Sequence, residues 1–163
     1  MRSTILLSAV LTLAAISPTH AATSAEAWSP FRPFLGTWSG TRVDADRGPR
    51  IVREYGSTAN NQNIEVRERV EGKSVVWGVL SFDTERAGIV LRPLSIDGIA
   101  SALVLEPKES TESRLVFTNL ESDPIRTRIS YDRTGWDEFT ERIERATSGQ
   151  ELTLVSETRF KRK

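Results

Sequence analysis

The side chains that carry most enzyme chemistry are almost absent from this sequence. It contains no cysteine, and its single histidine is His20. His20 follows an apolar stretch, Ile5–Ile16, and the helix-breaking Pro18, with small residues suited to cleavage after Ala21. Residues 1–21 are therefore interpreted as a cleaved signal peptide, so the mature chain has neither an imidazole nor a thiol.

This composition excludes several kinds of site from the mature chain. Nucleophilic catalysis by a Ser-His or Cys-His pair, zinc binding by His or Cys, and histidine-ligated haem all require the missing side chains. Asp44 and Asp46 flank one residue, but no glycine-rich loop of alternating ligands surrounds them, and solvated turn acids are the better interpretation. We expect no metal and no cofactor.

Two carboxylates remain as weak catalytic candidates. Glu68 lies on the apolar side of its predicted strand, and Glu141 does so beside Phe139. A carboxylate inside a barrel becomes an acid–base group unless a cation pairs with it, so one hypothesis is an isomerase or hydrolase. The favoured alternative is an interior salt bridge with an arginine such as Arg126 or Arg128.

The elements that must position these residues are short β-strands. In 63–72, Ile64, Val66 and Val70 alternate with charged residues, which predicts one buried and one wet face. Turn signals such as Asp97-Gly98 separate similar segments. Ten strands are predicted at 35–43, 50–56, 63–72, 73–83, 89–96, 99–105, 114–120, 125–131, 136–145 and 151–161.

The simple order of these strands predicts an all-β, up-and-down antiparallel barrel over 34–163, with a two-sheet sandwich as the alternative. A lead at 22–33 precedes the barrel, and Trp28 and Phe31 are expected to cap one end. The outward faces carry charges where a membrane barrel needs apolar side chains. We therefore expect no membrane insertion after signal cleavage.

The segment 34–40, Phe-Leu-Gly-Thr-Trp-Ser-Gly, resembles the first strand of calycin-type barrels. Lipocalins, fatty-acid-binding proteins and nitrobindin-like domains share a Gly-x-Trp there, matched by Gly36 and Trp38. The resemblance implies that Trp38 closes the barrel base and stacks on an arginine of the last strand, Arg159 or else Arg162. The haem of nitrobindin-like domains would lack its histidine here.

A second resemblance covers the middle of the chain. The runs Phe117–Asn119, Asp123-Pro124 and Arg128–Tyr131 are similar to those of small exported bacterial barrels. This resemblance implies a fold and says little about activity.

The leading functional hypothesis is a periplasmic or secreted barrel that binds a small apolar or amphipathic molecule without covalent chemistry. An eight- to ten-stranded barrel has an interior able to hold one small ligand. The alternative to both ligand binding and carboxylate catalysis is an envelope interaction protein with a filled barrel. The candidate ligand-binding residues are Trp77, Phe117, Tyr131 and Phe139, with Glu68 and Arg128 as polar anchors.

Charge argues against one class of partner. Loss of Arg2 with the signal leaves 21 basic and 22 acidic side chains, so the mature chain carries a formal net charge of −1. No basic excess exists to attract a phosphate backbone, and nucleic-acid binding is not expected.

Overall fold

The computed structural model describes residues 24–43, 48–58, 62–93, 101–119, 123–147 and 149–163. The predicted signal peptide, the turn acids Asp44 and Asp46, and the Asp97-Gly98 turn lie outside these ranges. Neither helix in the described ranges has the length and apolar character needed to cross a bilayer.

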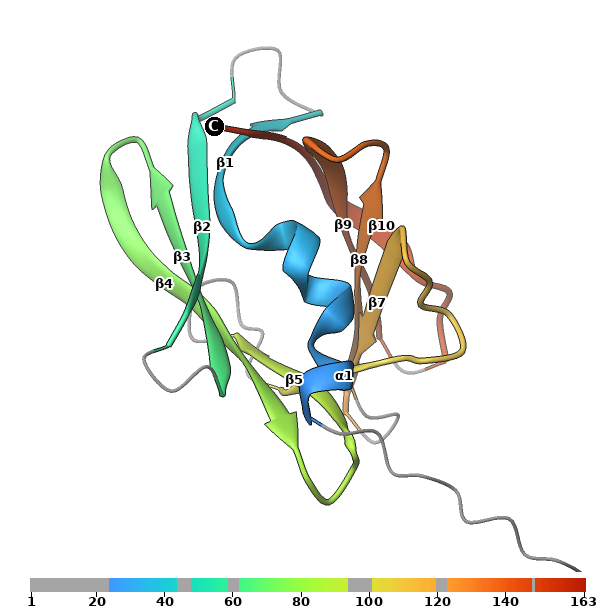
Figure 1. The fold of residues 1–163 in the computed structure, drawn as a ribbon. Coiled ribbons are helices and arrows are strands. Elements are labelled where there is room, and N and C mark those ends of the chain that lie inside the picture. The colour runs from blue at the N-terminus through green and yellow to red at the C-terminus, as the bar shows by residue number, and fades with distance from the viewer. Residues whose placement is uncertain (1–23, 44–47, 59–61, 94–100, 120–122, 148) are drawn as a thin grey trace, which may run out of the picture.

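Ten antiparallel strands form a closed barrel in which neighbours in sequence are neighbours in space (Figure 1). This confirms the predicted up-and-down barrel and excludes the sandwich. The strands are β1 (Gly36–Arg42), β2 (Ile51–Ser57), β3 (Asn63–Val70), β4 (Lys73–Asp83), β5 (Gly88–Pro93), β6 (Leu103–Leu105), β7 (Arg114–Thr118), β8 (Ile125–Arg133), β9 (Glu138–Thr147) and β10 (Thr153–Arg162).

The first and last strands close the ring. Trp38 of β1 is paired with Arg162 of β10 on one side, and Gly36 is paired with Tyr55 of β2 on the other. Because successive strands run in opposite directions, the start of β1 and the end of β10 lie at the same end of the barrel as the turns between β4 and β5, β6 and β7, and β8 and β9. We call this end the seam end.

Inward-facing aromatic side chains fill the barrel. Phe117, Phe139 and Phe160 are all fully buried, as the period-two alternation of strand side chains allows. Gly40 of β1 makes room for one of these rings, because a Cβ atom there would lie 2.5 Å from Phe160 Cε1. Phe160 thereby lies flat against β1 and stacks on Phe139, with ring centroids 4.8 Å apart.

The lead consists of a short helix α1 (Ser24–Ala27) and a 3₁₀ helix η1 (Ser29–Phe34), which runs across the barrel opening (Figure 1). A 3₁₀ helix has three residues per turn, so Phe31 and Phe34 share one side and Pro30 and Pro33 another. Both phenylalanines are 3% exposed and belong to the core cluster. The lead is therefore part of the core: Phe31 is buried in it, and Trp28 is partly buried against it with its ring on that of Phe31.

Candidate functional site

A buried ion cluster lies in the barrel interior. Arg53 of β2 donates from Nε and Nη2 to Glu68 Oε2 of the paired strand β3, at 2.8 and 2.6 Å. Its Nη1 donates across the barrel to Glu141 of β9. The guanidinium carbon also lies 4.6 Å from the ring centroids of Trp77 and Phe160. Arg53 is thus held by two carboxylates and two aromatic rings.

The charge of Arg53 is secure in this setting. Burial alone would lower the pKa of the guanidinium, but the negative charges of Glu141 and Glu68 and the neighbouring Tyr55 outweigh that effect and hold the pKa well above its usual value. The cluster therefore keeps one cation between two carboxylates.

Two tyrosines extend the cluster toward the seam end. Arg53 Nη1 lies 3.4 Å from the Tyr55 hydroxyl, which is also hydrogen-bonded to the Tyr131 hydroxyl. Burial raises the pKa of Tyr55 to about 12, and burial together with Tyr55 and Glu141 raises that of Tyr131 well above its usual value. Both phenols are therefore protonated at neutral pH, and they serve as hydrogen-bonding groups.

Little space adjoins the tyrosine end of this cluster. The cavity lined by Tyr55, Tyr131, Phe31 and Phe34 has a volume of about 10 Å³, which is room for one water at most. Glu141 is 3% exposed and Glu68 11%. The interior salt bridge favoured for these carboxylates is present, but its arginine is Arg53 rather than Arg126 or Arg128.

The candidate ligand-binding aromatics are inside the barrel, whereas their proposed cationic anchor is outside. Trp77, Phe117, Tyr131 and Phe139 all belong to the buried core cluster. Arg128 faces outward because its neighbours Ile129 and Tyr131 face inward on β8. It is 25% exposed and forms ion pairs with Glu109 and Glu144, the latter at 3.9 Å.

The barrel-closing pair also differs from expectation. Arg162, not Arg159, lies over the Trp38 ring, with its guanidinium carbon 4.3 Å from the centroid. Arg162 also donates to the carbonyl oxygens of Leu35 and Pro33, at 2.9 and 2.6 Å. Arg159 is exposed, because it alternates with the inward-facing Phe160.

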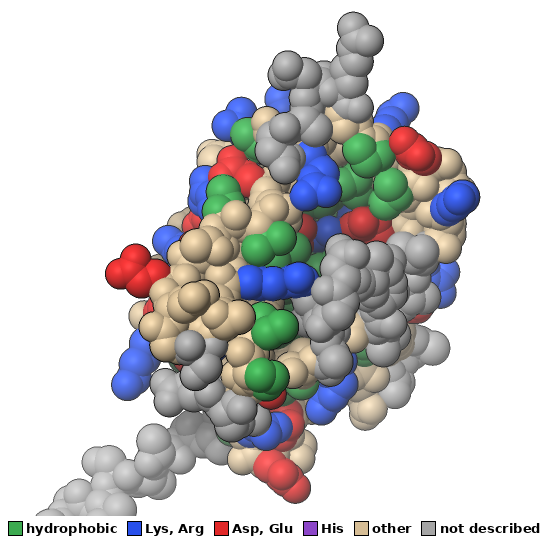
Figure 2. Space-filling view, turned by 180° about the vertical axis from the view of Figure 1, so that it is seen from behind, with side chains coloured by type: hydrophobic (Ala, Val, Ile, Leu, Met, Phe, Trp, Pro, Cys, Tyr) green, Lys and Arg blue, Asp and Glu red, His purple; other side chains and the backbone are tan. Residues whose placement is uncertain are grey.

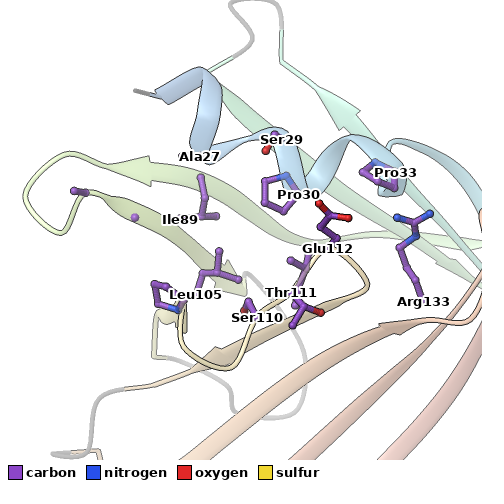
Figure 3. A pocket seen from close by; sticks show the side chains of 14 residues that line it. Ala27, Ser29, Pro30, Pro33, Ile89, Leu105, Ser110, Thr111, Glu112 and Arg133 are labelled. Atoms are coloured by element: carbon purple, nitrogen blue, oxygen red, sulfur yellow. The ribbon is translucent and has the colours of Figure 1, made fainter. Parts of the chain in front are cut away.

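A larger pocket lies at the seam end, between the lead and the rim of the barrel (Figure 3). Its volume is about 560 Å³. Pro30 and Pro33 of η1 form part of its wall, while Phe31 and Phe34 on the other side of η1 face the core. The lining residues are Ala27, Ser29, Pro30, Pro33, Ala87, Gly88, Ile89, Leu105, Pro107, Ser110, Thr111, Glu112, Leu115 and Arg133.

The helix η1 therefore separates the pocket from the filled interior, and Leu115 of β7 borders both spaces. Sequence reasoning missed this pocket because Pro30 and Pro33 were interpreted only as part of a lead. Residues three apart face the same way in a 3₁₀ helix. The spacing of Pro30 and Pro33, and of Phe31 and Phe34, therefore predicts one proline side and one phenylalanine side.

Neither the family models nor the curated proteins compared with the sequence match it. Within the described ranges, no three acidic or histidine side chains lie close enough together to hold a metal ion. What the geometry itself establishes is a closed ten-stranded antiparallel barrel of the kind that calycins have, with an ion cluster in its core and a pocket at its seam end.

Proposed function

We propose that this protein is a calycin-like barrel that binds one small, partly apolar molecule, without covalent chemistry, in the pocket between η1 and the barrel rim. The observation that carries the proposal is the pocket itself. Its volume of about 560 Å³ falls within the range of about 300–1,000 Å³ found for ligand sites. Its walls combine apolar groups such as Ile89 and Leu105 with a few polar ones.

The interior cluster supports placing the ligand at this pocket. Glu68 and Glu141 both pair with Arg53, and their side chains are only 11% and 3% exposed. This pairing weighs against the carboxylate-driven isomerase or hydrolase, because one cation holds both of its candidate groups. The proposal accordingly includes no cofactor and no covalent intermediate.

The proposal also concerns location and partners. Residues 1–21 have the three-part pattern of a secretory signal, and the protein is proposed to act in the periplasm or outside the cell. Figure 2 shows basic and acidic side chains interspersed over the face behind the view of Figure 1. Such a surface suits a small-molecule ligand better than a nucleic acid.

A second candidate is the interaction protein with a filled barrel. The observation that favours it is the barrel core of buried aromatic side chains, together with Trp136, which is 74% exposed in the turn between β8 and β9. An exposed tryptophan is the side chain most often found to anchor a protein partner.

The test of ligand binding uses N-phenyl-1-naphthylamine, a neutral apolar fluorophore, with the purified protein. Figure 3 shows the Ala27 side chain directed into the pocket, so Ala27→Trp should fill it. We expect the parent protein to bind the probe and Ala27→Trp to bind it at least about tenfold more weakly, the equivalent of about 1.4 kcal/mol.

Ser113→Trp is the matched control, because Ser113 is exposed on the same rim and does not line the pocket. It should bind the probe like the parent. Absence of binding to the parent, or equal binding to both variants, would overturn the proposed site and favour the interaction protein.

A further inference from the structure

Two oppositely charged side chains line the seam-end pocket. The Arg133 guanidinium and the Glu112 carboxylate form no hydrogen bond or ion pair with any described residue. Neighbouring arginines behave differently. Arg114 pairs with Asp132 at 3.5 Å, and Arg142 pairs with the same carboxylate at 2.8 Å. The Arg133 guanidinium is therefore available to a ligand of the pocket.

The backbone fixes the two charges close together. The amide of Arg133, at the end of β8, donates to the Ser113 carbonyl at 2.7 Å, and Glu112 immediately precedes Ser113. Figure 3 shows both charged side chains reaching from this rim toward the η1 prolines. Since the two groups do not form an ion pair, their charged atoms are more than 4.0 Å apart.

The rest of the pocket wall is mostly apolar. Pro30 and Pro33 lie on the lead, and Ile89 and Leu105 come from β5 and β6. A ligand with a single charge would meet one unlike and one like charge from the rim. A ligand with both charges matches each of them, and its apolar body meets the remaining wall.

We propose that the ligand is zwitterionic, with an ammonium group near Glu112, a carboxylate near Arg133 and an apolar body against the η1 prolines. This inference rests on the proposed function. Because the two protein charges do not meet as an ion pair, they suit a ligand whose ammonium and carboxylate are separate groups. An apolar dipeptide with free termini has this chemistry, and its size suits the pocket.

The experiment measures displacement of N-phenyl-1-naphthylamine by leucyl-leucine, by its N-acetyl derivative and by its carboxy-terminal amide. Removal of either charge from the ligand should weaken its displacement of the probe from the parent protein about fivefold, as expected for a partly exposed charge pair. Arg133→Gln should weaken leucyl-leucine and the N-acetyl derivative but not the amide. Glu112→Gln should weaken leucyl-leucine and the amide but not the N-acetyl derivative.

Arg114→Gln and Glu109→Gln are the controls, because each removes a charge from the same rim without altering the pocket lining. From both control variants, the three ligands should displace the probe as they do from the parent. Equal competition by the three ligands, or loss of amide binding in Arg133→Gln, would overturn the zwitterion assignment while leaving probe binding intact. Failure of the probe to bind the parent would instead overturn the proposed function.

Discussion

Replacement of Arg53 by methionine tests what the interior ion cluster does for the fold. Methionine retains the length of the stem and its contact with the rings of Trp77 and Phe160. It removes the only cation that contacts Glu68 and Glu141 in the described interior. The variant therefore leaves two carboxylates buried without a counter-charge.

We expect a large loss in the free energy of unfolding, because the two carboxylates stay buried after their cation is removed. Removal of one partner from a buried ion pair costs about 3–5 kcal/mol, against a total free energy of unfolding of about 5–15 kcal/mol for a domain. Arg53→Met should therefore lose about a fifth of the stability at least, and up to all of it. The triple variant Arg53→Met, Glu68→Leu and Glu141→Leu removes all three charges together and should return to the parent value or exceed it.

The assay is equilibrium unfolding in urea, followed by the fluorescence of the buried Trp38 and Trp77. Arg67→Met is the control, because Arg67 lies outside the barrel and is 64% exposed, and its unfolding midpoint should match that of the parent. A loss below about 1 kcal/mol for Arg53→Met would refute the reasoning. So would a triple variant as unstable as the single one.

Two further predictions concern the tyrosines and the seam. The folded-state pKa of Tyr55, about 12, exceeds the ordinary value of 10.0, and the pKa of Tyr131 is raised as well. The contribution of the two tyrosines to the free energy of unfolding is therefore full below pH 10 and is lost as the pH rises toward 12. Near-ultraviolet absorbance should show little tyrosinate until the protein unfolds, and a normal titration near pH 10 would contradict this burial. Arg162→Met removes a stacking contact and two hydrogen bonds to carbonyl groups, so it should lower the free energy of unfolding by about 2–3 kcal/mol. Arg159→Met should leave it nearly unchanged, and similar losses for both variants in thermal unfolding would contradict the assigned pairing with Trp38.

The barrel was predictable from the sequence because period-two alternation is a local property. The same alternation also predicts which arginines face inward, and the expected positions of Arg159 and Arg128 did not follow it. Phe160 faces inward, so Arg162 shares its side and Arg159 does not. Likewise, the inward faces of Ile129 and Tyr131 place Arg128 outside. Both corrections follow from assigning one face consistently along a strand.

The ion cluster was only partly predictable. Ile51, Arg53 and Tyr55 alternate on one side of β2, which marks Arg53 as inward-facing. Its contact with Glu141, however, joins residues 88 positions apart and depends on how the barrel closes. Local sequence patterns cannot predict a contact between residues so far apart in the chain. The two inward-facing carboxylates, Glu68 and Glu141, do predict that a cation lies near them.

Trp136 shows a different limit. The strand predicted at 136–145 begins with this residue, yet β9 begins at Glu138 and Trp136 lies exposed in the preceding turn. Side-chain propensity cannot locate the last residue of a turn, because tertiary contacts decide where a ladder begins. The seam-end pocket depends in the same way on how the lead folds back over the rim.

The seam between β1 and β10 has a consequence for how the barrel is made. The ladder that closes the ring joins Trp38 to Arg162, nearly the whole described length of the chain apart. Before β10 joins the sheet, β1 and β9 each present an open sheet edge, and Trp38 lacks its guanidinium cover. The folding chain can therefore assemble the intervening hairpins one by one, but its cooperative closure has to await the pairing of β10 with β1. High contact order at a single ladder makes this last step the slow one.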